Sequence, residues 1–456
     1  MLNWKSLHAI ICLIILNYLN GVTVLNEATK KLKRATYHLW TFTASKMISA
    51  FGAQIYAFAI SFYILQMTGS ATSFAANLVC SILPRTLLGP FAGYVADTYS
   101  RKRIVIIAQI ASSLAILGLL AVSLMYGLSL TAIYATTVVL SMASTFSSIA
   151  FTSSITGLVD EDRIQKAMSL NQMSISFAAI GSPAVGGLLY GAVPMPLFLI
   201  LYASASIFAV LLESTMDFNL FAKRKVKEEG APKEKMLDSM RAGLAYARLQ
   251  PLLMAMIWVA LLVNFLFGAV SVGYSFILIE KLKMLPTHFG LVEGAMAVGM
   301  LLMSIYLAAR KPFSSPILVS KWGIAALGLE MGLISVPLLI LLPYGGMFAF
   351  YVTISFISGA LGPLINTPLQ VFMMKLIEDD YKGRVFSILE TMAMALMPLA
   401  MVLFGFLYDI LPAPWILITS SVLLVVTVFV LLRASVIRQV TGPVPLAIAE
   451  QPIIDQ

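Results

Sequence analysis

The chain has 456 residues, of which 60% are hydrophobic and 11% are charged, and its formal net charge is +9. A soluble protein of this length normally carries about a quarter charged residues, so the composition excludes a soluble globular protein and predicts a polytopic membrane protein. The basic residues stand in short clusters between apolar runs, where membrane topology explains them without a nucleic-acid partner.

The first 34 residues form an apolar leader that allows three interpretations. Residues 7–25 are apolar apart from two asparagines and a glycine, and a basic run follows at residues 30–34. The leader is a thirteenth span, or a signal peptide without a convincing small-x-small cleavage site, or an untranslated stretch because translation begins near residues 22–25.

Twelve further apolar runs are long enough to span a membrane, since a helix of about 20 residues crosses a bilayer. They cover residues 39–65, 73–96, 104–125, 128–149, 167–190, 196–212, 252–279, 288–309, 319–341, 347–374, 385–408 and 414–432. The longest polar stretch separates two sets of six. The predicted domains are therefore the leader (1–34), an N-terminal six-helix bundle (35–213), a linker with an amphipathic helix (214–250), a C-terminal six-helix bundle (251–436) and a tail (437–456).

Lysine and arginine predict the orientation of these spans in a cell membrane. One set of connections carries nearly all of them, whereas the opposite set carries only Lys281 and Lys283. The basic set comprises residues 101–103, 163–166, 223–248, 310–311, 375–384 and 433–438. By the positive-inside rule, both ends of the twelve-span unit lie in the cytoplasm.

Two stretches of the chain are shifted copies of each other. Residues 158–190 and 376–408 align without a gap. Each contains an acidic triplet and then a matched serine (Ser169, Ser387), and each ends in the pattern Gly-x-Leu-Tyr. An internal membrane repeat of this kind predicts two pseudosymmetric bundles with a substrate path between them.

The most informative motif follows the second span. It consists of Gly89, Gly93, Asp97, Arg101, Lys102 and Arg103. The glycines can let two helices approach closely, and Asp97 can make a contact in one conformation that is broken in another. We interpret the set as a conformational latch. The simpler alternative is a basic anchor next to a chance aspartate.

This motif resembles the loop signature of the major facilitator superfamily, although Thr98 and Ser100 depart from the family pattern. The fifth span resembles the antiporter motif of the same family, with Pro183, Gly186 and Gly187 in place. Proline kinks a helix, and paired glycines allow close packing at the bend. The resemblance favours efflux, while ordinary small-residue packing is the alternative.

More of the chain resembles one branch, the macrolide-efflux and enterobactin-exporter-like permeases. The matching stretches are residues 65–71, 87–97, 168–172, 289–302, 365–370 and 382–388. The resemblance implies the major facilitator fold, an all-α membrane protein with twelve transmembrane helices in two pseudosymmetric six-helix bundles. It implies little about the substrate, because the branch exports chemically diverse compounds.

Three acids fall inside predicted spans and are candidates for proton coupling. Glu330 stands near the middle of the ninth span, Glu293 toward the outer end of the eighth, and Glu390 toward the cytoplasmic end of the eleventh. A charge at such depth is costly, so these carboxylates are expected to face a cavity and to exchange protons. Pairing with a neighbouring polar group is the alternative for each.

Other polar residues within the spans are candidates for lining the substrate cavity. They are Gln54, Arg85, Lys46, Asn264, Asn366 and Gln370. The two cations can instead extend to the cytoplasmic face or pair with a glutamate. The resemblance implies an acid in the first span, as in many relatives, but this chain has Ala53 beside Gln54 at that place. The expected role in proton coupling therefore moves to the C-terminal half.

The sequence thus predicts a monomeric secondary transporter that exports a lipophilic compound in exchange for protons. It contains no phosphate-binding GxxxxGK[ST] motif, and no cofactor, metal or catalytic constellation is expected. Three alternatives stay open: an exporter of a siderophore or another anionic metabolite, a proton-driven importer, and a transport-inactive sensor or scaffold.

Overall fold

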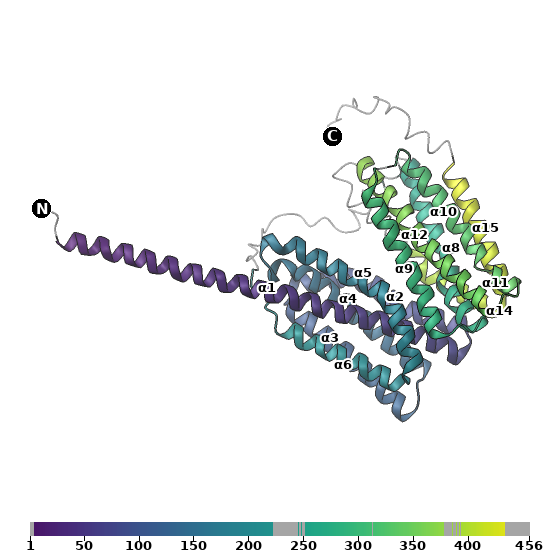
Figure 1. Ribbon diagram of the computed structural model, residues 1–456, viewed down its shortest axis with the longest axis horizontal. Helices are drawn as coiled ribbons and strands as arrows, with labels where there is room; N and C mark the ends of the chain where they lie inside the picture. Colours follow the sequence, from purple (N-terminus) through teal and green to yellow (C-terminus); the bar gives the residue numbers. More distant parts are fainter. Residues whose placement is uncertain are drawn as a thin grey trace, which may run out of the picture. The chain divides into compact units, whose positions relative to one another are not determined.

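The computed structural model describes residues 4–221, 245, 248, 251–311, 313–377, 385, 389, 392 and 394–433. The described part consists of helices and short connections (Figure 1), which confirms the predicted all-α fold class. The helices are α1 (Trp4–Thr68), α2 (Ala71–Thr98), α3 (Arg101–Met125), α4 (Leu130–Leu158), α5 (Glu161–Ala192), α6 (Met195–Ser214), α8 (Pro251–Phe276) with the π-helix η1 (Ile277–Lys281), α9 (Pro286–Ala309), α10 (Pro316–Leu333), α11 (Val336–Leu339), α12 (Tyr344–Leu376), α14 (Met397–Ile410) and α15 (Ala413–Leu431).

Within the described residues, 11 helices are long and apolar enough to cross a membrane, and the shorter apolar helix Met397–Ile410 lies in the predicted eleventh span. The predicted twelve spans therefore agree approximately with the structure. The predicted linker beyond residue 221 and the tail at 437–456 lie outside the described residues, apart from two isolated positions in the linker.

Local sequence explains where many helices begin and end. Proline stands in the first turn of α9, α10, α14 and α15, where its missing N–H has no intrahelical partner to lose. Gly69 ends α1 with a φ of +61°, and its N–H donates to the carbonyl of Leu65 at 2.9 Å. A left-handed residue of this kind closes a helix at little cost only when it lacks a side chain.

The leader continues directly into the first span. Helix α1 runs without a break from Trp4 to Thr68, and its stretch of membrane-spanning character is Thr29–Thr68. The side chains before Thr29 lie outside the described part of the structure. The three interpretations of the leader stay open.

The helices form two compact units. Unit 1 comprises Met1–Gln54, Pro84–Ala179 and Met195–Lys227, and unit 2 comprises Ile55–Leu83, Ile180–Pro194 and Glu228–Gln456. In unit 1, α3 packs against α4 and α6. In unit 2, α9 packs against α12, α10 against α12 and α15, and α8 against α14 and α15.

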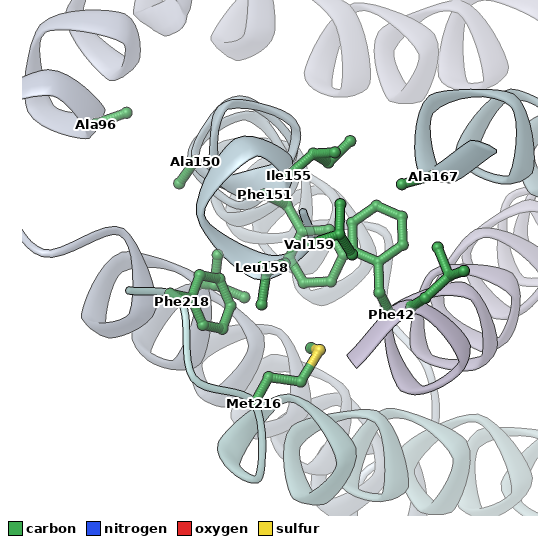
Figure 2. Packing of buried hydrophobic residues seen from close by; sticks show 12 residues of the cluster. Phe42, Ala96, Ala150, Phe151, Ile155, Leu158, Val159, Ala167, Met216 and Phe218 are labelled. Carbon is green, nitrogen blue, oxygen red and sulfur yellow. The ribbon is translucent and has the colours of Figure 1, made fainter. Parts of the chain in front are cut away.

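Aromatic side chains form the centre of the unit 1 core (Figure 2). The rings of Phe42 and Phe151 are stacked with centroids 4.7 Å apart, and Phe218 meets Phe151 edge-on at 6.1 Å. Met216 and Val159 are buried in the same cluster. This cluster joins α1 and α4 to the segment that follows α6, so it holds one end of unit 1 together.

Glycines bring α9 and α12 into backbone contact in unit 2. A side chain at Gly299 would collide with the carbonyl oxygen of Phe356, and one at Gly359 would collide with the carbonyl oxygen of Met296. Close approach through small residues is a common way for helices to pack where lipid surrounds them. This contact fixes the position of α9 against α12, and therefore the position of Glu293.

Candidate functional site

Glu330 lies where a membrane helix is interrupted. It occupies the last turn of α10, and its carbonyl accepts the N–H of Ile334 at 3.0 Å. The chain turns before the short helix α11 begins, and the Ser335 hydroxyl donates to the carbonyl of Gly332 at 2.6 Å. Interrupted helices expose backbone groups at membrane depth and often border transport sites.

The carboxyl group of Glu330 is buried with one oxygen unsatisfied. Glu330 is 6% exposed, and its Oε2 has no hydrogen-bond partner among the described residues. The Ser358 hydroxyl of α12 lies close enough to the carboxyl group to interact with it. A buried oxygen without a partner is costly for a permanent charge, so this carboxyl group is suited to gaining and losing a proton.

Tyr274 connects Glu330 with the second predicted acid. Its hydroxyl shares a hydrogen bond of 2.5 Å with Ser355 of α12, and it lies near enough to both Glu330 and Glu293 to interact with them electrostatically. Tyr351 lies edge-on to the Tyr274 ring, with centroids 6.1 Å apart. The structure therefore gathers two of the three predicted acids around one tyrosine, in a cluster drawn from α8, α9, α10 and α12. Glu390 lies outside the described residues.

Unit 1 also contains a buried acid, Glu213. Glu213 of α6 is 3% exposed, and its Oε1 accepts the Ser45 hydroxyl at 2.7 Å. Lys46, on α1, interacts electrostatically with Glu213 and with Arg85. Its ammonium group also lies 5.8 Å from the centre of the Phe151 ring. Lys46 therefore lies within electrostatic range of a buried glutamate, and its predicted roles stay open.

The basic residues of the predicted latch bind backbone carbonyls. Arg101 donates to the carbonyl of Ser153 in α4 at 2.5 Å, and Lys102 donates to the carbonyls of Ser214 and Met216 at 2.8 Å each. Cations near helix C-termini interact favourably with the helix dipole and with the last carbonyls. Arg101 therefore binds α4 near its C-terminal end, and Lys102 anchors the end of α6.

Among the described residues, a methyl group at Gly89 or Gly93 would meet nothing within 4 Å. The close helix approach predicted for these two glycines therefore stays a prediction. The side chain of Asp97 lies outside the described part of the chain, and Arg103 is exposed.

The antiporter-like segment of α5 packs closely within unit 2. A side chain at Gly187 would collide with the carbonyl oxygen of Pro286 at the start of α9. A side chain at Gly290 would collide with the carbonyl oxygen of Pro183. A methyl group at Gly186 would lie 3.1 Å from the Phe58 ring. Pro183 and Gly187 thus lie at the contact of α5 with α9, and Gly186 lies at the contact of α5 with α1.

The remaining cavity candidates belong to both units. Gln54 and Arg85 are exposed in unit 1, and Asn366 and Gln370 are exposed in unit 2. The side chains of Asn264 and Asn366 each donate to the carbonyl four residues earlier in their own helix, at 2.8 and 3.0 Å. Each of these two amide groups thus has an acceptor within its own helix, and the predicted role in lining a cavity stays a prediction.

Several functional candidates were not predicted from the sequence. Glu213 and Asp409 each stand one residue beyond a predicted span and were therefore not counted as membrane acids. The structure extends α6 to Ser214 and α14 to Ile410, which includes both. Tyr274 and Ser355 carry no sequence signal of their own, because their importance comes from facing each other across two helices.

Comparisons with known proteins relate the chain to a large family of transporters. Residues 42–398 match the family model described as Major Facilitator Superfamily. The chain is 24% identical over 403 residues to macrolide efflux protein A of Streptococcus pyogenes, covering 88% of this chain and 96% of that protein. It is 28% identical to the uncharacterized MFS-type transporter YfiS of Bacillus subtilis (strain 168), covering 79% and 84%.

A third relative and two solved structures extend this picture. The multidrug efflux pump Tap of Mycolicibacterium fortuitum is 23% identical, with 83% of this chain and 90% of that protein covered. A bacterial homologue of the iron transporter ferroportin in an inward-facing state has a similar fold, with a TM-score of 0.62, 18% identity, and 86% and 98% of the two chains covered. The nucleoside transporter NupG gives a TM-score of 0.64 at 13% identity, with 86% and 98% covered.

Proposed function

Because the chain belongs to the major facilitator superfamily, and is thus a multi-span membrane transporter, we propose that it exports a lipophilic, drug-like compound in exchange for protons. The printed names of its relatives, macrolide efflux protein A and multidrug efflux pump Tap, support export of such compounds. The antiporter-like contact around Pro183 and Gly187 in α5 supports the same direction.

One observation carries the proposed coupling to protons: the placement of two carboxyl groups around Tyr274. Glu330 is buried with an unpartnered Oε2, and Glu293 interacts with the same tyrosine from α9. Each carboxyl group can hold one proton, and Tyr274 is hydrogen-bonded to Ser355 of α12, the helix that packs against both α9 and α10. A group that alternates between a neutral and a charged form at this depth can couple proton movement to a conformational change.

The coupling step requires no cofactor within this scheme. Protonation of Glu330 removes the charge of a buried carboxylate whose Oε2 has no hydrogen-bond partner among the described residues, and release of the proton restores that charge. The two forms differ in their cost of burial, so they favour different arrangements of the helices around α10. Binding of a lipophilic substrate to one arrangement is thereby linked to proton binding in the other.

The proposal is tested with substitutions that keep size and remove titration. Everted membrane vesicles containing the chain are given an imposed pH gradient, and uptake of fluorescent dyes and macrolides is measured. Glu330→Gln and Glu293→Gln are each expected to abolish gradient-driven uptake while retaining substrate binding. The matched control is Asp162→Asn, which removes an exposed carboxylate and should leave transport unchanged.

The same vesicles separate the alternative functions. Substrate movement in the opposite direction under the same gradient would indicate an importer. A double Gln variant that still accumulates substrate in a pH-dependent way would refute coupling at this pair. A chain that binds the panel but moves no compound under any gradient would indicate a sensor or scaffold.

A further inference from the structure

A groove runs along α1 and α6 in unit 1. Its volume is about 570 Å³. The residues that line it are Lys33, Thr36, Tyr37, Trp40, Thr41, Ala44 and Leu212. No step of the proposed transport cycle uses these residues.

The chemistry of the groove changes along its length. Lys33 lies at one end, the hydroxyl groups of Thr36 and Tyr37 follow, and Trp40 and Ala44 continue on the same helix. At about 1.5 Å per residue, Lys33 and Ala44 lie about 16 Å apart along α1. The groove therefore offers a charged end, a hydrogen-bonding middle and an apolar end, on a helix that has membrane-spanning character from Thr29 onward.

Its aromatic side chains have the exposure expected at a membrane interface. Trp40 is 56% exposed and Tyr37 is 50% exposed. Large amphipathic rings are enriched at the level of lipid headgroups, because one edge is apolar and another is polar. The Tyr37 hydroxyl shares a hydrogen bond of 2.9 Å with Thr215, which ties the groove wall to the end of α6.

Two further cations lie beside the groove. Arg163 donates to the Thr36 hydroxyl at 2.8 Å, and the Lys166 ammonium group lies 5.8 Å from the centre of the Trp40 ring. The Asp160 Oδ1 lies 3.5 Å from the Arg163 Nε and offsets the charge of that guanidinium group. Lys33 is exposed, and among the described residues it has no ion-pair or hydrogen-bond partner. The groove therefore has an excess of positive charge beside exposed aromatic rings.

We propose that this groove binds one anionic phospholipid. The phosphate lies against Lys33, and an acyl chain lies along Trp40, Ala44 and Leu212. Charge complementarity selects an anionic headgroup over a zwitterionic one. The apolar end selects a lipid over a soluble anion, because a soluble anion would use only the charged end and leave the rest of the groove uncovered.

Lipid retention in neutral detergent measures this directly. The purified full chain is titrated with phosphatidylglycerol or phosphatidylcholine, and bound lipid is counted by native mass spectrometry. One tightly held phosphatidylglycerol is expected, and Lys33→Gln should weaken it by about fivefold, the effect of one basic residue at a lipid surface. The control Lys311→Gln removes an exposed lysine elsewhere and should leave retention unchanged.

The position of the lipid acyl chain is measured separately, with a second variant. Phosphatidylglycerol with brominated acyl chains should quench a tryptophan signal that is lost in Trp40→Phe. Equal retention by the wild type and Lys33→Gln would overturn the proposal, as would equal binding of phosphatidylcholine. Competition by inorganic phosphate or glycerol phosphate would show a site for soluble anions and would also overturn it.

Discussion

The carboxylate of Asp409, at the end of α14, accepts the backbone N–H of Ala71 at 2.7 Å, which caps the first turn of α2. Its second oxygen accepts the Ser70 hydroxyl at 2.7 Å and the N–H of Thr72 at 3.1 Å. The cap of one helix is thus supplied from a position more than 300 residues later in the chain. All these residues belong to unit 2.

The Asp409 cap is expected to stabilise unit 2. Loss of an N-cap costs about 1 kcal/mol, because N–H groups at the helix start lose their acceptor. Asp409→Ala should lower the melting temperature by a few degrees, and Asp409→Asn should have a smaller effect because it keeps one acceptor oxygen. Scanning fluorimetry in detergent measures both. Asp162→Ala is the exposed control, and an equal melting temperature for Asp409→Ala would contradict the assignment.

The contact between α9 and α12 is tested by two glycines of one helix. Gly359→Ala places a methyl group against the carbonyl oxygen of Met296, whereas a methyl group at Gly362 meets nothing within 4 Å. We expect Gly359→Ala to cost about 1–3 kcal/mol, typical of overpacking, with less folded protein recovered. Gly362→Ala should be neutral. Similar thermal stability and yield for the two variants would show that α9 and α12 are less closely packed.

Tyr274 is expected to matter for transport through its hydroxyl group. Tyr274→Phe keeps the ring but leaves Ser355, which is 3% exposed, without its partner at a cost of about 1 kcal/mol or more. Gradient-driven transport should fall while membrane abundance stays near the wild-type level. Tyr126→Phe removes a hydroxyl from an 82% exposed tyrosine and serves as the control. Transport at the wild-type rate in Tyr274→Phe would show that the Tyr274 hydroxyl has no role in proton coupling.

Asp97 remains a predicted latch residue. Asp97→Asn keeps the shape and removes the charge, so transport should fall sharply while the amount in the membrane changes little. Asp217→Asn, at an exposed position of unit 1, is the comparison. If Asp97→Asn transports normally, the motif is only an anchor, which is the role that Arg101 and Lys102 have in this structure.

The predicted orientation is tested with tags. A tag in the loop at residues 223–235 and a tag at the C-terminus should both report the cytoplasm, because basic residues gather on that side. Removal of residues 1–23 should leave insertion and transport intact. An external signal from either tag would overturn the topology, and loss of insertion would identify the leader as a genuine span.

The two copies of the repeat, residues 158–190 and 376–408, have similar helix contacts but different hydrogen bonds. The alignment matches Gly187 with Gly405 and Tyr190 with Tyr408, and both glycines lie at close contacts in unit 2. At Gly405 a side chain would lie 2.6 Å from the Ala75 methyl group. The tyrosines differ, because Tyr408 donates to the carbonyl of Ala269 at 3.0 Å and Tyr190 donates to Gln66 at 2.8 Å. The repeat therefore predicts where the helices meet, but not which atoms they share.

The sequence by itself determined the class of the protein, the approximate number of spans and the position of Glu330 and Glu293 within apolar runs. Those properties follow from hydropathy and from the length of a helix, which act along the chain. Only the tertiary structure decided that both acids lie within electrostatic range of Tyr274, that Lys46 lies within electrostatic range of Glu213 and that Asp409 caps α2. Each of these relationships joins residues on different helices, and helix packing depends on side-chain shape and small-residue contacts that hydropathy does not encode.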